Sequence, residues 1–398
     1  MLFYLKLFFW FALFLVFYSY VGYGILLFLI IKIKGKKSNI LLSSQNSQDL
    51  PEVTLIIAAY NEENYIEPKI ENSLQLNYPK DKLHFFFVTD GTTDSTNERI
   101  LNHKKSLGAR VQLFFQPERL GKIAAVERIM PFVETPIIVF SDANTDLNAD
   151  AILNIVKHYQ NPKVGAVAGE KRVQLSGEAA GAGEGIYWKY ESQLKKWDYI
   201  LYSVVGAAGE LFSMRTHLHQ PVERDTLIED FVTTMRIAKN GYRVGYAPDA
   251  YAVEGHSANV KEELKRKIRI SAGGLQAIWR LRALLNPFKY GVLTFQYVSH
   301  RVLRWTLAPL FLPIILFLNY YFVRVQTQPY PLYKILLWAQ LFFYTAAILG
   351  WLFEQLKMKV KIFYVPYYFC VINYSVYRGF MRLVAGSQSV VWEKAKRA

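Results

Sequence analysis

Short apolar runs alternate with helical patterns through the middle of the chain. The runs with strand character are residues 53–59, 84–88, 110–115, 136–140, 164–173 and 243–253. Helical patterns of about ten to fifteen residues separate several of them, as strands linked in βαβ units require. The pattern predicts an α/β domain with a largely parallel sheet, whose ligand site lies at the carboxyl ends of the strands.

Longer apolar stretches near both ends of the chain are long enough to cross a bilayer. Residues 2–31 carry one charge, Lys6, and residues 307–323, 335–353 and 362–377 form three more candidates. The lysines that follow the first stretch place the next domain in the cytoplasm by the positive-inside rule. Basic residues also follow residues 362–377, so either one span is miscounted or this last segment is re-entrant.

These patterns divide the chain into five parts. We expect an N-terminal transmembrane anchor at 1–37, a linker at 38–50, a cytoplasmic domain at 51–260, interfacial amphipathic helices at 261–300, and a C-terminal transmembrane region with a tail at 301–398. The interfacial assignment depends on the basic segment 261–269 and on the apolar and basic helix that follows it.

Composition agrees with a folded domain attached to a membrane. The 398 residues are 52% hydrophobic and 20% charged, with a formal net charge of +15. The lysines and arginines gather beside the apolar stretches, where they suit anionic headgroups, so membrane lipids rather than nucleic acid are the expected partner. The single cysteine, Cys370, lies in an apolar segment, which excludes a disulfide framework and a cysteine-based zinc site.

Oxygen-bearing side chains follow the apolar run 136–140. Asp142 and Asn144 come directly after it, and Asp146 is two residues further on. Carboxylate and amide oxygens at a strand tip suit Mg²⁺ or Mn²⁺, ions that proteins usually share with substrate phosphates. Alternatively, Asp142 and Asn144 cap the helix that starts near Asp150, or they form an Asx turn. This stretch by itself favours neither interpretation.

Polar residues also end other strand-like runs. Glu62 follows the first run, Asp90 the second, and Lys122 the third, as a ligand-binding rim requires. Glu229 and Asp230 open a predicted helix over residues 231–239. Two acids in a first turn suit the helix dipole, which is their structural interpretation. In the functional interpretation, one of them is a general base at the mouth of the site.

Three further segments bear on the site. The glycines of Gly206–Gly209 let the backbone approach a ligand closely. Arg266 and Arg269 share a helical face, where they either clamp phosphate or form a solvated surface. The aromatic residues between 187 and 199 are either core or a stacking platform for a sugar, and core is the safer interpretation.

In their order along residues 50–280, these motifs resemble those of membrane-embedded, inverting family-two glycosyltransferases. That group contains the cellulose, chitin, hyaluronan and poly-N-acetylglucosamine synthases. The resemblance implies a GT-A-type nucleotide-sugar-binding domain, with one N-terminal and about three C-terminal transmembrane helices. It also implies a UDP-sugar donor, a Mg²⁺ or Mn²⁺ cofactor, and a polysaccharide or lipid acceptor.

The same resemblance assigns roles to individual residues. The catalytic pair is Asp230, as general base, and Glu229. Asp142 and Asn144 stand at the D-x-D metal motif, with an amide in place of the second acid, for which Asp146 compensates. The remaining roles are donor binding by Ala59, Tyr60, Glu62, Asp90, Lys122, Asp142, Arg266 and Arg269, and acceptor binding by Gly209 and Glu210.

Two motifs depart from the family pattern. Ile228 stands where the T-E-D motif has threonine. In the Q-x-x-R-W motif of processive synthases, Arg266 replaces glutamine and Ile270 replaces tryptophan, while Arg269 is retained. The loss of the tryptophan removes a stacking surface for the acceptor sugar, which leaves processive synthesis open.

The resemblance predicts a metal-dependent hexosyl or N-acetylhexosaminyl transferase of a bacterial inner membrane, with a cytoplasmic catalytic domain. The expected reaction extends a polysaccharide from a UDP-sugar and translocates the glycan. The alternative is transfer of one sugar to a membrane lipid, such as polyprenyl phosphate or a ceramide-like acceptor. A third interpretation is a catalytically silent scaffold, against which Asp90, Asp142 and Asp230 all argue, because a scaffold needs none of them.

Overall fold

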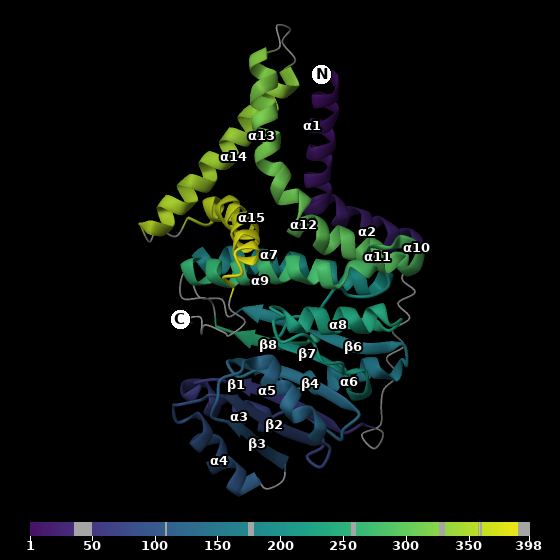
Figure 1. The fold of residues 1–398 in the computed structure, drawn as a ribbon, viewed down its shortest axis with the longest axis vertical. Helices are drawn as coiled ribbons and strands as arrows, with labels where there is room; N and C mark the ends of the chain where they lie inside the picture. Colours follow the sequence, from purple (N-terminus) through teal and green to yellow (C-terminus); the bar gives the residue numbers. More distant parts are fainter. Residues whose placement is uncertain are drawn as a thin grey trace.

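A computed structural model describes residues 1–35, 50–107, 110–173, 179–255, 260–325, 331–356, 358 and 360–388 of the chain. Most of the expected linker at 38–50 and the end of the expected tail, from residue 389, lie outside the described residues. The described part has a sheet domain at one end, long helices at the other, and a layer of helices between them (Figure 1).

One eight-stranded sheet runs through the domain that the described residues form. Its order is β3-β2-β1-β4-β7-β6-β8-β5. The strands are β1 (Val53–Ala59), β2 (Leu83–Asp90), β3 (Val111–Gln116), β4 (Ile137–Asp142), β5 (Thr145–Leu147), β6 (Val164–Val173), β7 (Leu211–Arg215) and β8 (Arg243–Glu254). The half from β3 to β4 is parallel, whereas β7 is antiparallel to both β4 and β6, and β5 is antiparallel to β8. Because β6 is parallel to β8, the sheet is mixed: it has the parallel pairings that the sequence predicted, together with antiparallel strands that the sequence did not predict.

Helices cover both faces of the sheet because successive side chains of a strand point to opposite faces. Leu55 and Ile57 of β1 join one core cluster, while Ile56 between them joins the other. The helices of the sheet domain are α3 (Glu63–Leu74), α4 (Thr96–Leu107), α5 (Lys122–Ile129), α6 (Ala151–Val156) and α8 (Glu229–Lys239), with 3₁₀ turns η4 (Met130–Phe132), η5 (Lys157–Gln160) and η6 (Thr216–Leu218). The parallel half places the carboxyl ends of β1, β2 and β4 at one edge.

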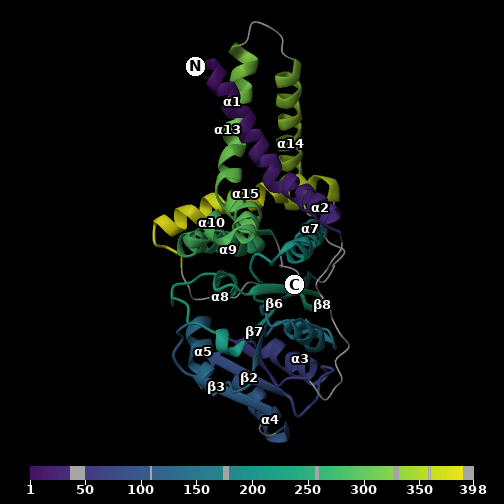
Figure 2. The same ribbon diagram turned by 90° about the vertical axis from the view of Figure 1, so that its right-hand side faces the viewer.

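Three helices in the described part of the chain are long and apolar enough to cross a membrane. They are Leu2–Lys34, Leu307–Val325 (α13) and Pro331–Gln355 (α14). The first consists of α1 (Leu2–Phe17), a π-helical turn η1 (Tyr18–Gly22) and α2 (Tyr23–Lys34). Phe9 of α1 packs against Phe322 of α13, with ring centroids 5.7 Å apart. In Figure 2, α1, α13 and α14 extend away from the sheet domain, whereas α2 lies beside α7.

Two C-terminal helices of the described residues, and not about three as expected, are long and apolar enough to cross a membrane. The helix over the expected third span, α15 (Lys361–Val384), does not meet the composition of a membrane span. It lies against α9 (Val260–Arg280), where Ser375 Oγ is 2.9 Å from Ser271 Oγ. Polar side chains that pair with a neighbouring helix make α15 less apolar than a lipid-facing span, which explains the difference.

The middle layer contains α7 (Ala179–Leu201), α9 and a series of shorter helices. The shorter ones are η7 (Arg282–Leu285), α10 (Pro287–Tyr290), α11 (Val292–Tyr297), the π-helical turn η8 (Val298–Val302) and α12 (Leu303–Trp305). In Figure 2 this layer lies between the sheet and the three candidate spans. The segment 261–300, expected to form interfacial helices, falls largely in this layer, and its contact with a membrane interface stays a prediction.

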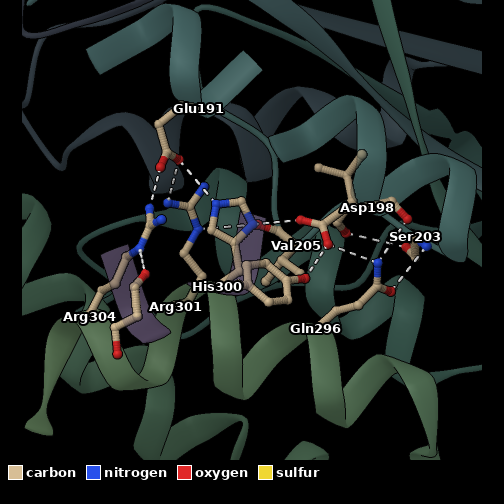
Figure 3. A network of polar contacts seen from close by, with 11 residues as sticks. Glu191, Asp198, Ser203, Val205, Gln296, His300, Arg301 and Arg304 are labelled. Carbon is tan, nitrogen blue, oxygen red and sulfur yellow. Dashed lines mark hydrogen bonds and ion pairs between the residues drawn. The ribbon is translucent and has the colours of Figure 1, made fainter. Parts of the chain in front are cut away.

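A buried charged network joins α7 to the segment that leads into α13 (Figure 3). Glu191, only 1% exposed, accepts a hydrogen bond from Arg304 at 2.5 Å and lies 3.0 Å from Arg301 Nη1 and 3.2 Å from His300 Nε2. On the other side of the imidazole, His300 Nδ1 is 2.6 Å from Asp198 Oδ2. Removing one partner of a buried ion pair costs about 3–5 kcal/mol, so the network fixes how these helices dock.

The same network reaches the first candidate span. The Tyr23 hydroxyl donates a hydrogen bond to Asp198 Oδ1 at 2.5 Å. Arg304 Nε donates to the backbone carbonyl of Ser19 at 2.9 Å. Ser19 lies in the π-helical turn η1, where the regular pattern of helical hydrogen bonds is interrupted. The network therefore joins α1–α2 to the rest of the molecule through side chains as well as through apolar packing.

One added methyl group at Gly206 should strongly lower the stability of the protein. Its φ is +80°, and an added Cβ would lie 2.1 Å from Phe231 in α8. Gly241 has a similar φ of +93° with nothing within 4 Å, so Gly241→Ala is a matched control. We expect Gly206→Ala to destabilise the protein by about 1–3 kcal/mol more than Gly241→Ala, because of overpacking. Thermal unfolding of the purified variants measures this, and equal midpoints would contradict it.

Candidate active site

A cavity of about 1050 Å³ lies where the ends of β1, β2 and β4 and the segment before β7 face α7, α8 and α9. Apart from Asp146, every residue to which the sequence assigned a donor, acceptor, metal or catalytic role lines it: Ala59, Tyr60, Glu62, Asp90, Lys122, Asp142, Asn144, Gly209, Glu210, Glu229, Asp230, Arg266 and Arg269. Asp146 does not line it. That residue is exposed on β5, so it is not placed to compensate for Asn144 as the sequence suggested.

Asp90 ends β2 at one side of the cavity and is 5% exposed. Its Oδ2 accepts a hydrogen bond from the Gly121 backbone N–H at 2.6 Å. Within the described residues its Oδ1 accepts no hydrogen bond, and Arg128 Nη1 is 3.9 Å away. A buried acceptor oxygen without a donor favours a ligand that brings an N–H or O–H group.

Tyr60 and Arg119 form a second part of this side of the cavity. The Arg119 guanidinium lies 3.6 Å from the centre of the Tyr60 ring, and both residues line the cavity. When an arginine stacks on an aromatic ring, its guanidinium lies parallel to the ring. Its N–H groups then point outward in the plane of the guanidinium and can bind a ligand. Arg119 was not predicted from the sequence.

Lys122 lies between two acids in the middle of the cavity. Its Nζ is 3.0 Å from Asp142 Oδ1 and 3.3 Å from Glu229 Oε1. Burial by itself lowers the pKa of Lys122, but the attraction of Asp142 and Glu229 outweighs burial and raises this pKa above its ordinary value. Lys122 is therefore a fixed positive charge that connects the tip of β4 with the start of α8.

Asp142 and Asn144 offer hard oxygen ligands that fit a divalent cation. Burial raises the pKa of Asp142, although Lys122 opposes the shift. Lys122 already lies on Asp142 Oδ1, which shows that this carboxylate attracts a positive charge. Among the described residues, no group of three or more His, Cys, Asp or Glu side chains is placed to hold a metal. Further ligands would therefore come from substrate phosphates, as is usual for Mg²⁺.

The turn that carries Asp142 and Asn144 is held from below by a buried lysine. Lys69 of α3 donates hydrogen bonds to Ser141 Oγ at 2.8 Å and to the Thr145 carbonyl at 2.7 Å. Burial lowers the pKa of Lys69 to about 7. These bonds tie both ends of the turn to α3, so Lys69 positions the candidate metal ligands without lining the cavity itself.

Asp230 lies at the start of α8 with an unusual pKa. Burial, with repulsion from Glu229, raises the pKa of Asp230 to about 7. Its Oδ1 accepts a hydrogen bond from the Phe231 N–H at 2.8 Å. An added Cβ at Gly209 would lie 3.4 Å from Asp230 Oδ2, so glycine keeps this side of the carboxylate open. A carboxyl group with a pKa near 7 is suited to accept a proton at neutral pH.

Glu210, predicted for the acceptor, belongs to a buried ion network. Lys171 of β6 contacts both Glu210 and Glu254, and Arg266 Nη1 is 3.8 Å from Glu210. Burial opposes ionisation of Glu210, but Lys171 and Arg266 lower its pKa well below the ordinary value. Lys171 and Glu254 were missed because they come from β6 and β8, whose pairing across about eighty residues leaves no local signal in the sequence.

The predicted phosphate clamp has its two arginines in the cavity wall. Arg266 Nε donates to Glu263 Oε2 at 2.9 Å, on the same helix. Arg269 Nη1 donates to the Leu227 carbonyl at 3.2 Å. These contacts hold the guanidinium groups in place, and phosphate binding by Arg266 and Arg269 stays a prediction.

Further residues of the cavity wall change the sequence-based picture. Trp188 lines the cavity, although core was the safer interpretation for it. Lys195, Arg301 and Trp305 also line it and were not predicted. Arg301 and Trp305 precede α13 in a segment that the sequence assigned to the membrane region, because basic and aromatic residues beside a span also suit a membrane flank.

Known proteins are similar to this chain in sequence. Residues 54–220 match the family model "Glycosyl transferase family 2". The chain is 24% identical over 255 residues to a Bacillus subtilis (strain 168) protein described as "Probable glycosyltransferase YdaM". It is 25% identical over 240 residues to the poly-beta-1,6-N-acetyl-D-glucosamine synthase of Staphylococcus aureus (strain MSSA476). The matches cover 62% and 59% of this chain, and 60% and 57% of those relatives.

A solved structure shares the fold over nearly the whole chain. The mannosyltransferase PcManGT from Pyrobaculum calidifontis, in complex with GDP-Man and Mn²⁺, has a TM-score of 0.70 and 22% identity. The similarity covers 95% of this chain and 99% of that chain. Residues 54–220 thus match a glycosyl transferase family 2 domain, and the chain has a GT-A-like fold.

The pKa of Asp230 predicts a pH profile. A general base acts when it is deprotonated, so kcat/KM should rise about tenfold per pH unit below about pH 7 and level off above it. Asp230→Asn should lower kcat/KM by about 10²–10⁴-fold. The measurement is nucleotide release between pH 5 and 9.

Asp225→Asn is the control, because Asp225 is an exposed acid five residues earlier and should leave the profile unchanged. A flat profile in the unmodified protein, or unchanged turnover in Asp230→Asn, would contradict the role of Asp230 as the base.

Proposed function

We propose that this protein is a membrane-bound, inverting glycosyltransferase that transfers a sugar from a UDP-sugar to a growing polysaccharide. The observation that carries the proposal is the position of Asp230. Its carboxyl group, with a pKa of about 7, lies in one cavity with Asp142 and Asp90, and Lys122 connects Glu229 beside it to Asp142. A base, a cationic centre and a nucleotide-binding acid are the groups that this reaction needs.

The donor is proposed to bind at the strand tips. Asp90 has an acceptor oxygen for an N–H group of the base, and Arg119, stacked on Tyr60, has donors for ribose or phosphate. Ala59 and Glu62 complete this wall. The neighbour PcManGT was solved with GDP-Man, which supports a nucleotide sugar in general. The choice of UDP comes from the resemblance to polysaccharide synthases.

The diphosphate is proposed to lie near Asp142 and Asn144. A bound Mg²⁺ or Mn²⁺ would stabilise the negative charge that develops on the leaving diphosphate, and the Mn²⁺ in PcManGT supports this cofactor. Lys122 adds a fixed positive charge from the protein, and Arg266 and Arg269 face the same cavity. Charge stabilisation therefore does not depend on the metal site alone.

The transfer step is proposed to be a single displacement. Asp230 takes the proton from an acceptor hydroxyl held beside Gly209 and Glu210. The oxygen attacks the anomeric carbon from the face opposite the diphosphate, the bond to the diphosphate breaks, and the configuration inverts. No covalent nucleophile is needed.

The two candidate functions differ in the acceptor that receives the sugar. A polysaccharide is supported by the similarity to the Staphylococcus synthase and by the indole of Trp305, which lines the cavity and packs on Phe231 with ring centroids 5.2 Å apart. A lipid that receives one sugar is supported by Ile270 in place of the motif tryptophan and by only two candidate C-terminal spans in the described residues. We place the catalytic domain in the cytoplasm of a bacterial cell, at the inner membrane.

A donor screen tests the proposal. Purified full-length protein is incubated with Mg²⁺ or Mn²⁺ and with individual UDP-sugars or GDP-mannose, and nucleotide release and product size are measured together. We expect one UDP-sugar to give a long glycan, and Asp230→Asn to give none, because the acceptor hydroxyl then keeps its proton.

If nucleotide is released only when a lipid is present, and each lipid receives one sugar, the acceptor is a lipid and the polysaccharide proposal is wrong. Turnover of GDP-mannose alone would overturn the choice of UDP. No nucleotide release with any donor, in protein that unfolds cooperatively, would overturn the proposed function.

A further inference from the structure

Lys195 is a buried lysine in the cavity wall that forms no ion pair with any of the described residues. The residue is 3% exposed and lines the cavity. Within the described part of the chain its Nζ makes no hydrogen bond or ion pair, and the features beside it are the rings of Trp188 and Tyr246, 5.8 and 5.9 Å away. Burial lowers the pKa of Lys195, and attraction from the carboxylates of Glu170, Glu191 and Glu210 offsets this only in part.

The acids near Lys195 are already bound by other groups. Glu170 accepts hydrogen bonds from the hydroxyls of Ser192 and Tyr246. Glu191 is held by the charged network of His300, Arg301 and Arg304, which is drawn in Figure 3. Glu210 and Glu254 share Lys171. These acids act on Lys195 only from a distance, and none of them forms an ion pair with it among the described residues.

The indole of Trp188 lies beside Lys195 in the cavity wall. Its indole has three ammonium groups around it, those of Lys171 at 5.3 Å, Lys267 at 5.5 Å and Lys195 at 5.8 Å. Lys171 and Lys267 are both paired with glutamates. An indole in a cavity wall stacks on a sugar ring or covers an apolar chain, and Lys195 lies beside it as a charge that a ligand can neutralise.

Lys195 faces the cavity from the helix that is tied to the membrane helices. Trp188, Glu191 and Lys195 are spaced i, i+3 and i+7 on α7, so they share one face of it. Glu191 binds Arg304, whose Nε bonds the Ser19 carbonyl in the first candidate span. The position is therefore linked through α7 to the first candidate span, while the Tyr246 ring of β8 lies 5.9 Å from Lys195 on the sheet side.

We propose that Lys195 and Trp188 form an acceptor subsite for a single anionic group, a phosphate or a carboxylate that the acceptor carries. The proposal rests on the proposed function, because it places the acceptor in the same cavity as Asp230. An ammonium group offers three N–H donors to such an anion, and a buried site makes this charge-assisted contact strong. Without the ligand, the unpaired charge is a cost to stability.

Equilibrium binding tests the subsite without requiring turnover. The probes are dodecyl phosphate, dodecyl β-glucuronide and the neutral dodecyl β-glucoside, which share one alkyl chain. Binding to full-length protein in neutral phosphatidylcholine nanodiscs is measured with saturating UDP, so that the donor end is occupied. We expect at least one anionic probe to bind about tenfold more tightly than the glucoside, and the tighter of the two identifies phosphate or carboxylate as the source.

Lys195→Met is the test variant and Lys196→Met its control. Met keeps the length of the side chain and removes the charge, while Lys196 is the exposed neighbour on the same helix. We expect the preference for the anionic probe to fall about tenfold in Lys195→Met and to persist in Lys196→Met. Thermal unfolding of Lys195→Met should occur at or above the temperature of the unmodified protein, because a buried unpaired charge is gone.

Equal affinities of all three probes for the unmodified protein would overturn the proposal. So would a preference that persists in Lys195→Met, or one lost equally in Lys196→Met. The proposed function is measured separately, by sugar transfer: if transfer is absent while the binding preference holds, only the catalytic assignment fails.

Discussion

Buried charge that must be paired is the constraint on which this structure depends. A carboxylate such as Glu191 can be buried between the sheet domain and the candidate spans only because His300, Arg301 and Arg304 contact it. Asp198 is held in the same way by His300 and by other donors. Because these partners come from segments about a hundred residues apart, satisfying the charges also fixes how α7 docks on the helices that lead into the membrane.

Most charged groups in the cavity are also paired, but three groups are not fully compensated. Lys122 pairs with Asp142 and Glu229, and Lys171 pairs with Glu210 and Glu254. In contrast, Asp90 keeps an oxygen without a donor, Asp230 has a pKa raised by burial, and Lys195 has no counter-ion among the described residues. We assign these three groups to the nucleotide, the acceptor hydroxyl and an anion on the acceptor. Incomplete compensation is what a ligand can relieve on binding.

The arrangement of layers gives these groups different surroundings. Asp90 and Asp142 are at strand ends, on the sheet side, where backbone amides and short turns are available for a nucleotide. Lys195, Arg301 and Trp305 come from helices of the middle layer, next to the spans. Asp230 opens α8 and lines the same cavity. In the proposed function, a soluble donor and a membrane-associated acceptor would enter this cavity from the two layers.

The sequence by itself determined the features that depend on neighbouring residues. Apolar runs that end in Asp90 and Asp142 predicted strand tips, two acids before residues 231–239 predicted the start of a helix, and long apolar stretches predicted three of the candidate spans. Only the tertiary structure decided which distant groups meet. The antiparallel β7, the packing of α15 on α9, the pairing of Lys171 with Glu254, and the unpaired Lys195 all depend on contacts between segments far apart in the chain. The local sequence pattern indicates which residues are buried and with what period. Which charges pair depends on the folded structure, because the partners are far apart in the chain.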